Sequence, residues 1–116
     1  MQTTVFLPSI PMRWDETREI RRPTFDLTPV RQYGRAVVLV PENKDYDLTD
    51  LFDVQPVVDL IKAGLADSTE DDYIVAIGDP VLICAAAAVQ VQRHNNVRML
   101  RWDRLQQRYK IMEFQL

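Results

Sequence analysis

The chain has 116 residues, 47% of them hydrophobic, and carries a formal net charge of −3. This length and composition predict one globular domain over residues 1–116, with a core that needs no disulfide or metal for stability. The single cysteine excludes an internal disulfide, and the longest apolar run, residues 80–89, is too short to cross a bilayer. Because no basic segment followed by an apolar run opens the chain, we expect no signal peptide and a soluble protein of a reducing compartment.

The charges are distributed unevenly. Residues 42–72 contain ten acidic and two basic side chains, whereas residues 93–110 contain six basic side chains and one acidic. Such a dipole can orient a partner or a neighbouring subunit. The simpler interpretation, which we favour, is a solvated surface on which the two signs attract each other within the fold, each pair contributing little.

The first part of the chain predicts a strand and then an arm. Residues 3–7 are short and rich in β-formers. Residues 8–25 form an irregular Pro/Arg-rich arm, because each proline removes a backbone donor, and loops of this length are commonly functional. Residues 26–33 have helical character, in which Thr28 could act as a cap and Pro29 could take the first helical position.

The rest of the chain alternates strands with helices. The apolar run 35–40 predicts a second strand buried on both faces, as in a parallel sheet. A helix begins near Asp47, and Pro56 either interrupts it or starts a second helix capped by Gln55. The piece after Pro56 carries an apolar stripe. The remaining segments predict a strand, a helix, and two antiparallel strands that form a terminal hairpin, over residues 73–77, 81–94, 97–102 and 108–116.

This alternation predicts an α/β fold, a two-layer or three-layer sandwich around a mostly parallel sheet of about five strands, with a C-terminal antiparallel hairpin. The helix after Pro80 is apolar nearly all round, from Val81 to Val89. We therefore expect it to be covered on more than one side, either by the arm or by a second subunit.

The turn Gly78-Asp79-Pro80 is the first candidate site, because open α/β sheets bind ligands where strands end and helices begin. Asp79 also suits a helix N-cap, however, and Pro80 lacks an amide donor, so we favour a structural cap over an anion site. No phosphate-binding loop sequence is present. If the turn binds a ligand, the polar residues near the strand ends are Ser9, Arg13, Asn43 and Asp79.

Metal and nucleophilic sites have weaker support. The carboxylates Asp45, Asp47, Asp50 and Asp53 lack the glycine turn and distal glutamate of a calcium loop, so they fit the solvent face of a helix better than a metal site. Cys84 lies among apolar residues and is expected in the core.

Histidine catalysis is also disfavoured. The single histidine, His94, would have to combine with Ser9 or Ser68, and neither serine lies on a nucleophile elbow. We therefore favour a protein that is not an enzyme and expect neither a cofactor nor a bound metal.

Basic and aromatic residues are the best indication of a binding surface. On the C-terminal hairpin they could stack bases, but strand alternation sends Arg98 and Arg101 to opposite faces, and the acidic pI of about 5.1 opposes a general nucleic-acid binder. A protein interface fits better, because these residue types are enriched in interface cores. The expected interface residues are Arg13, Trp14, Arg18, Arg21, Arg101, Trp102 and Tyr109.

Three phrases of the sequence carry a resemblance: residues 25–29 (FDLTP), residues 71–80 (DDYIVAIGDP), and residues 100–104 (LRWDR) followed by Tyr109. Together they resemble a group of small uncharacterised proteins of tailed bacteriophages. The resemblance implies a setting, the host cytoplasm or the virion, and implies no chemistry.

The leading hypothesis is therefore a non-enzymatic phage accessory protein that binds a host or phage protein, or a second copy of itself. The alternative is a small nucleotide- or phosphate-binding domain that uses the Gly78-Asp79-Pro80 turn. We expect no membrane association.

Overall fold

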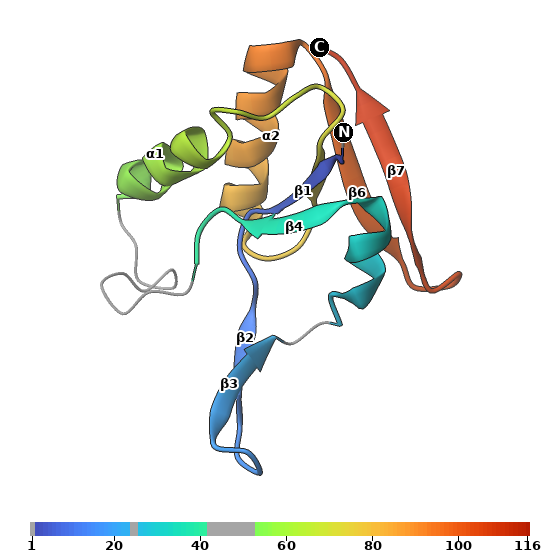
Figure 1. Cartoon of the computed structure of the whole chain (residues 1–116). Helices are drawn as coiled ribbons and strands as arrows, with labels where there is room; N and C mark the ends of the chain where they lie inside the picture. The colour runs from blue at the N-terminus through green and yellow to red at the C-terminus, as the bar shows by residue number, and fades with distance from the viewer. Residues whose placement is uncertain (1, 24–25, 42–52) are drawn as a thin grey trace.

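The computed structural model describes residues 2–23, 26–41 and 53–116. Its centre is a five-stranded sheet with the strand order β4-β1-β5-β6-β7 (Figure 1). The first four strands in that order run parallel, and β7 pairs with β6 in the antiparallel direction. The strands are β1 (Thr4–Leu7), β4 (Arg35–Val38), β5 (Tyr73–Val75), β6 (Val97–Asp103) and β7 (Arg108–Phe114). The predicted α/β fold with a mostly parallel sheet and a terminal hairpin is confirmed.

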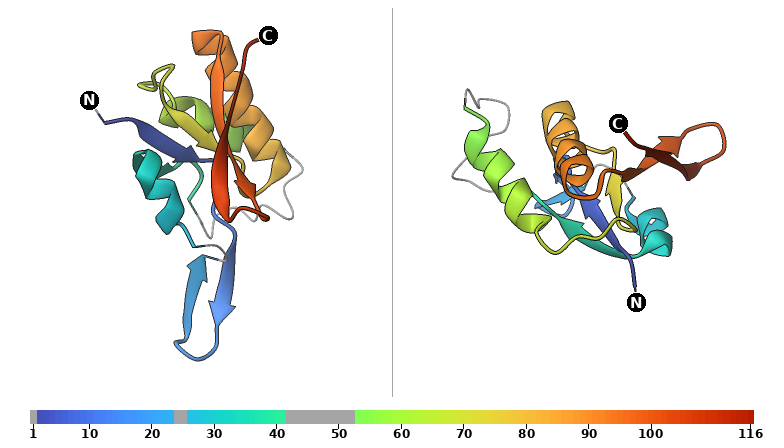
Figure 2. Two further views of the ribbon diagram at one scale, coloured as in Figure 1. Left: turned by 90° about the vertical axis from the view of Figure 1, so that its right-hand side faces the viewer. Right: turned by 90° about the horizontal axis from the view of Figure 1, so that it is seen from above.

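Helices lie on both faces of this sheet, but unequally. The α-helices α1 (Gln55–Gly64) and α2 (Pro80–His94) cover one face, and the short 3₁₀ helix η1 (Thr28–Tyr33) lies against the other (Figure 2). Neighbouring residues of one strand enter different cores, because side chains alternate across a sheet. Phe6 belongs to the cluster under α1 and α2, whereas Val5 belongs to the cluster beside η1.

Local sequence signals explain both α-helices. In α1, Val57 and Ile61 are buried at helical spacing, and Leu65, directly after the helix, continues this buried row. Gln55 is not the cap that the sequence predicts, because it lies inside the first turn of the helix. Its backbone amide donates to Asp53 Oδ1 at 3.0 Å. Helix α2 begins after Asp79 as predicted and ends at His94, and Asn95 follows in the left-handed conformation common after helices.

The expectation of an irregular arm is wrong. Residues 12–23 form a second, two-stranded antiparallel sheet, β2 (Met12–Asp15) and β3 (Ile20–Pro23). The prolines do not prevent this hairpin, because Pro11 precedes β2 and Pro23 is the last residue of β3. Asp15 shapes the turn by accepting hydrogen bonds from the amides of Thr17 and Arg18.

Two burial predictions are also wrong. Strand β4 is an edge of the sheet, so Arg35 and Ala36 are exposed and the strand is not buried on both faces. Cys84 is exposed, because α2 turns Leu82, Ala86 and Val89 toward the sheet.

The helix expected from Asp47 lies outside the described residues. Within the described chain, no helix is long and apolar enough to span a membrane.

Candidate functional site

The topology brings Ser9 and Asp79 together at the point where the order of strands reverses. The chain leaves β1 to form β4 on one side and then returns to form β5 on the other side of β1. In open α/β sheets, ligands bind outside the carboxyl ends of the strands at such a switch point. Ser9 follows β1 and Asp79 follows β5, so this position is the candidate ligand site of the fold.

Close packing fills that position. Ser9 is only 5% exposed, and its hydroxyl oxygen accepts a hydrogen bond from the amide of Asp79 at 3.4 Å. Gly78 has a φ of +100°, and a Cβ added to it would overlap Ser9 Oγ and lie 2.9 Å from the Ser9 carbonyl oxygen. The turn after β5 is thus closed onto the turn after β1 by contacts that only glycine permits.

Asp79 completes the start of α2. Its Oδ1 accepts from the amide of Val81 at 2.8 Å, and Pro80 has no amide hydrogen to offer. The amides of Asp79 and Val81 are both engaged, and a carboxylate there would repel a phosphate. This geometry supports the structural interpretation of the turn. The other predicted ligand residues add nothing, because the Arg13 side chain and Asn43 lie outside what the structure describes.

A second candidate site is the hairpin β2–β3, called the arm from here on. The arm projects from the carboxyl-terminal edge of the large sheet, away from both α-helices (Figures 1 and 2). Trp14 is 55% exposed and Ile20 50% exposed. An ion pair between Arg22 Nη1 and Asp15 Oδ2, at 3.2 Å, links the two strands. Desolvation raises the pKa of Asp15, but the hydrogen bonds that its carboxylate accepts lower the pKa by more, so it lies below its ordinary value.

The C-terminal hairpin β6–β7 holds the remaining predicted interface residues. Arg101 and Trp102 are exposed, whereas Tyr109 is only 5% exposed. The rings of Trp102 and Tyr109 pack edge to face with centroids 5.0 Å apart, and the Tyr33 hydroxyl donates to the Tyr109 carbonyl oxygen at 3.1 Å. Burial raises the pKa of the Tyr109 hydroxyl, with a smaller contribution from Asp26. Tyr109 therefore packs within the domain and offers little surface to a partner.

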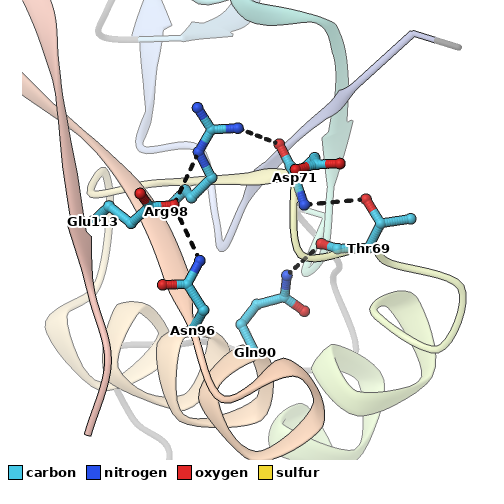
Figure 3. A network of polar contacts seen from close by, with 6 residues as sticks. All are labelled: Thr69, Asp71, Gln90, Asn96, Arg98 and Glu113. Carbon is cyan, nitrogen blue, oxygen red and sulfur yellow. Dashed lines mark hydrogen bonds and ion pairs between the residues drawn. The ribbon is translucent and has the colours of Figure 1, made fainter.

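The structure also brings together Ser68 and His94, one of the serine and histidine pairs weighed for catalysis. Ser68 Oγ lies 3.2 Å from His94 Nε2, while it donates to Gln90 Oε1 at 2.6 Å. Gln90 is 1% exposed and donates from its amide nitrogen to the Thr69 carbonyl oxygen (Figure 3). The Ser68 hydroxyl donates its proton to Gln90, so that proton is not held by His94. The cluster ties α2 to the turn before β5 and has no activated nucleophile.

Metal binding gains no support from the described residues, among which no group of three His, Cys, Asp or Glu side chains could hold an ion. Asp53 accepts a hydrogen bond from the backbone amide of Gln55. The other carboxylates of the acidic set, Asp45, Asp47 and Asp50, lie outside the described residues. Sequence reasoning missed the exposed Ile20 on the arm and three residues of β7, which are Ile111, Met112 and Phe114. One signal in the sequence could have revealed the residues of β7. A strand with one solvent-exposed face alternates apolar and polar residues, whereas residues 108–114 place apolar side chains on both faces.

These features define a small α/β protein with one mostly parallel sheet, a filled switch point and a projecting two-stranded arm. The chain belongs to the family described as Phage Pam3 gp32-like protein, whose model matches residues 3–116. This match confirms the resemblance to phage proteins. No curated protein and no solved structure matches the chain.

Proposed function

We propose that this phage protein has no catalytic activity and acts by binding another protein through the arm. The exposure of Trp14 and Ile20 on a projecting hairpin is the observation that carries the proposal. A two-stranded hairpin alone is marginally stable in water, and a partner that covers its apolar residues would stabilise it. The protein would act in the host cytoplasm or as part of the virion.

The composition of the arm suits an interface. Trp14 pairs with Arg21 and Met12 pairs with Pro23 across the two strands, so these four residues share one face. Tryptophan and arginine are the residue types that contribute most often to binding energy at protein interfaces. Arg18 is exposed at the tip of the arm. A suitable partner would offer an apolar pocket bordered by carboxylates, and Arg101 and Trp102 could extend the contact.

The experiment compares Trp14→Ser with Leu105→Ser in the tagged full-length protein. Both changes remove an exposed apolar side chain from a hairpin, and Leu105 is 96% exposed. We expect proteins captured from phage-infected cells by the unchanged chain to be lost with Trp14→Ser and retained with Leu105→Ser. Deletion of residues 11–24 should abolish capture without changing the circular dichroism of the α-helices. Equal capture by all the variants would refute a role for the arm.

The alternative function is binding of a nucleotide or phosphate at the Gly78-Asp79-Pro80 turn, and its location at the switch point is the observation in its favour. A thermal-shift screen against nucleotides and sugar phosphates tests it. A ligand at a hundred times its dissociation constant should add about 2.7 kcal/mol of stability. A ligand whose thermal shift is altered by Asp79→Ala would support ligand binding at this turn. A ligand whose thermal shift is insensitive to Asp79→Ala would not.

A further inference from the structure

Strand β7 is a long edge strand with no neighbour on its outer side within the described part of the chain. It is seven residues long, and every residue from Arg108 to Phe114 pairs with β6 on the inner side. The other edge strand, β4, has four residues. An edge of this length presents a row of backbone donors and acceptors to any strand that meets it, and β7 contains no proline that would interrupt pairing.

Both faces of β7 expose apolar side chains. Ile111 is 45% exposed on the η1 face, and Met112 and Phe114 are 41% and 44% exposed on the face that carries α2. The hairpin β6–β7 extends sideways from the helices, as the view from above shows (Figure 2). A helix laid on the sheet would cover one face only. A strand added to the edge would cover part of both faces and satisfy the backbone groups as well.

We propose that the β7 edges of two copies of this chain pair in the antiparallel direction about a two-fold axis at Ile111. The two five-stranded sheets then form one continuous sheet of ten strands. Most homo-oligomers of soluble proteins have this two-fold symmetry, in which one surface patch pairs with itself. The inference adds a self-association surface to the proposed function and does not depend on the arm.

The charges of β7 select this arrangement. Residues opposite each other must point to the same face, so only registers that keep this parity are possible. About Ile111, all seven residues overlap, with Lys110 opposite Met112, Tyr109 opposite Glu113 and Arg108 opposite Phe114. No like charges face each other. Glu113 lies on the opposite face from Arg108 and Lys110, so this register avoids repulsion but forms no ion pair between the two strands.

Neighbouring registers are worse. Centring the axis on Lys110 or Glu113 would place a charge opposite its own copy, and centring it on Tyr109 would place Arg108 opposite Lys110. An axis at Met112 avoids repulsion but shortens the overlap to residues 110–114. Parallel pairing in register would oppose every charge with itself. The strand is therefore most complementary to a second, antiparallel copy of itself centred on Ile111.

The first test measures mass in solution for the unchanged chain, Ile111→Lys and Leu60→Lys. Leu60 is an apolar residue of α1 that is 41% exposed, so it is a matched control away from the edge. We expect about 27 kDa, twice the 13.5 kDa of the chain, for the unchanged protein and for Leu60→Lys. Ile111→Lys places two lysines face to face and should raise the dimer dissociation constant at least about tenfold. A monomeric unchanged protein, or a dimer that Ile111→Lys leaves intact, would overturn the inference.

A second test reads the register and does not rely on a destabilising variant. The exposed native thiol is first removed by Cys84→Ser. In that background Ile111→Cys should form an interchain disulfide on mild oxidation, because its two copies meet on the axis. Phe114→Cys should not, since its two copies would lie about 20 Å apart. Crosslinking of Phe114→Cys instead would refute this register. A dimer that persists in Trp14→Ser but is lost in Ile111→Lys separates this surface from the arm.

Discussion

The guanidinium carbon of Arg98 lies 4.5 Å from the centre of the Tyr73 ring, a cation–π contact between paired residues of β6 and β5. Arg98 Nη1 also donates to the Asp71 carbonyl oxygen at 3.1 Å, and its Nε lies 3.4 Å from the Glu113 carboxylate (Figure 3). That nitrogen is buried and makes no hydrogen bond of its own, so the interaction with Glu113 is electrostatic. Arg98 thereby connects three adjacent strands and the turn before β5.

This arrangement predicts that Arg98→Met lowers the free energy of unfolding by about 1–3 kcal/mol, through loss of the cation–π contact and of the charged hydrogen bond. Arg101→Met is the matched control, because Arg101 lies on the same strand, points to the other face and is exposed. Its effect should stay within about 0.5 kcal/mol. Urea denaturation of both variants provides the measurement, and equal losses would show that Arg98 has no special structural role.

The contact between Gly78 and Ser9 predicts a different loss. Gly78→Ala would introduce a Cβ at a φ of +100°, against a backbone carbonyl oxygen that cannot move aside. Backbone strain and overpacking should together lower stability by about 2–5 kcal/mol. Thermal unfolding followed by circular dichroism measures this loss.

Gly64→Ala is the control for that substitution. At Gly64 the added Cβ would meet Cδ2 of Leu39, the far end of a flexible side chain, and alanine favours the helix. We expect little change or a small gain in stability. A Gly78→Ala variant as stable as Gly64→Ala would contradict the tight closure of the switch point.

The start and end of α2 and its flanking strands could be predicted because their signals are local. Asp79 before Pro80 marks the helix start, and Asn95 marks its end. The side of α2 that faces the sheet could not be predicted, because nearly every residue from Val81 to Val89 is apolar and the helix has no polar face to fix its rotation. The apolar neighbours of Cys84 therefore predict a core position, although the thiol is exposed.

Tertiary contacts set the remaining differences. Pro11 and Pro23 predict an irregular arm, because only the strand pairing reveals that they lie at the ends of two strands. Tyr109 is predicted at an interface, but Trp102 packs against its ring and Tyr33 donates to its carbonyl oxygen. Tyr33 lies 76 positions away, and no local pattern reports a contact across that distance. The sequence predicts that Ser9 and Asp79 lie near each other, because both follow strands of a parallel sheet. Their direct hydrogen bond depends on the closeness that Gly78 allows.

The turn between β6 and β7 predicts a pH effect. Lys110 Nζ lies 2.8 Å from Asp103 Oδ2, and the amides of Gln106 and Leu105 donate to Oδ1, so the pKa of Asp103 lies below its ordinary value of 3.8. A lowered pKa means that the folded state favours the charged form. The resulting stabilisation is present above the ordinary value and is lost as the pH falls through the lowered pKa.

Titration of the Asp103 carboxyl carbon by nuclear magnetic resonance should therefore give a midpoint below 3.8. Lys110→Met should move this midpoint upward, because the ammonium group is the largest cause of the shift. Lys62→Met, which removes an exposed lysine of α1, should leave it unchanged. Asp103→Asn should make the fall in unfolding free energy below about pH 4 less steep, because one carboxylate no longer takes up a proton on unfolding. A midpoint that does not respond to Lys110→Met would show that the turn amides alone hold the charge.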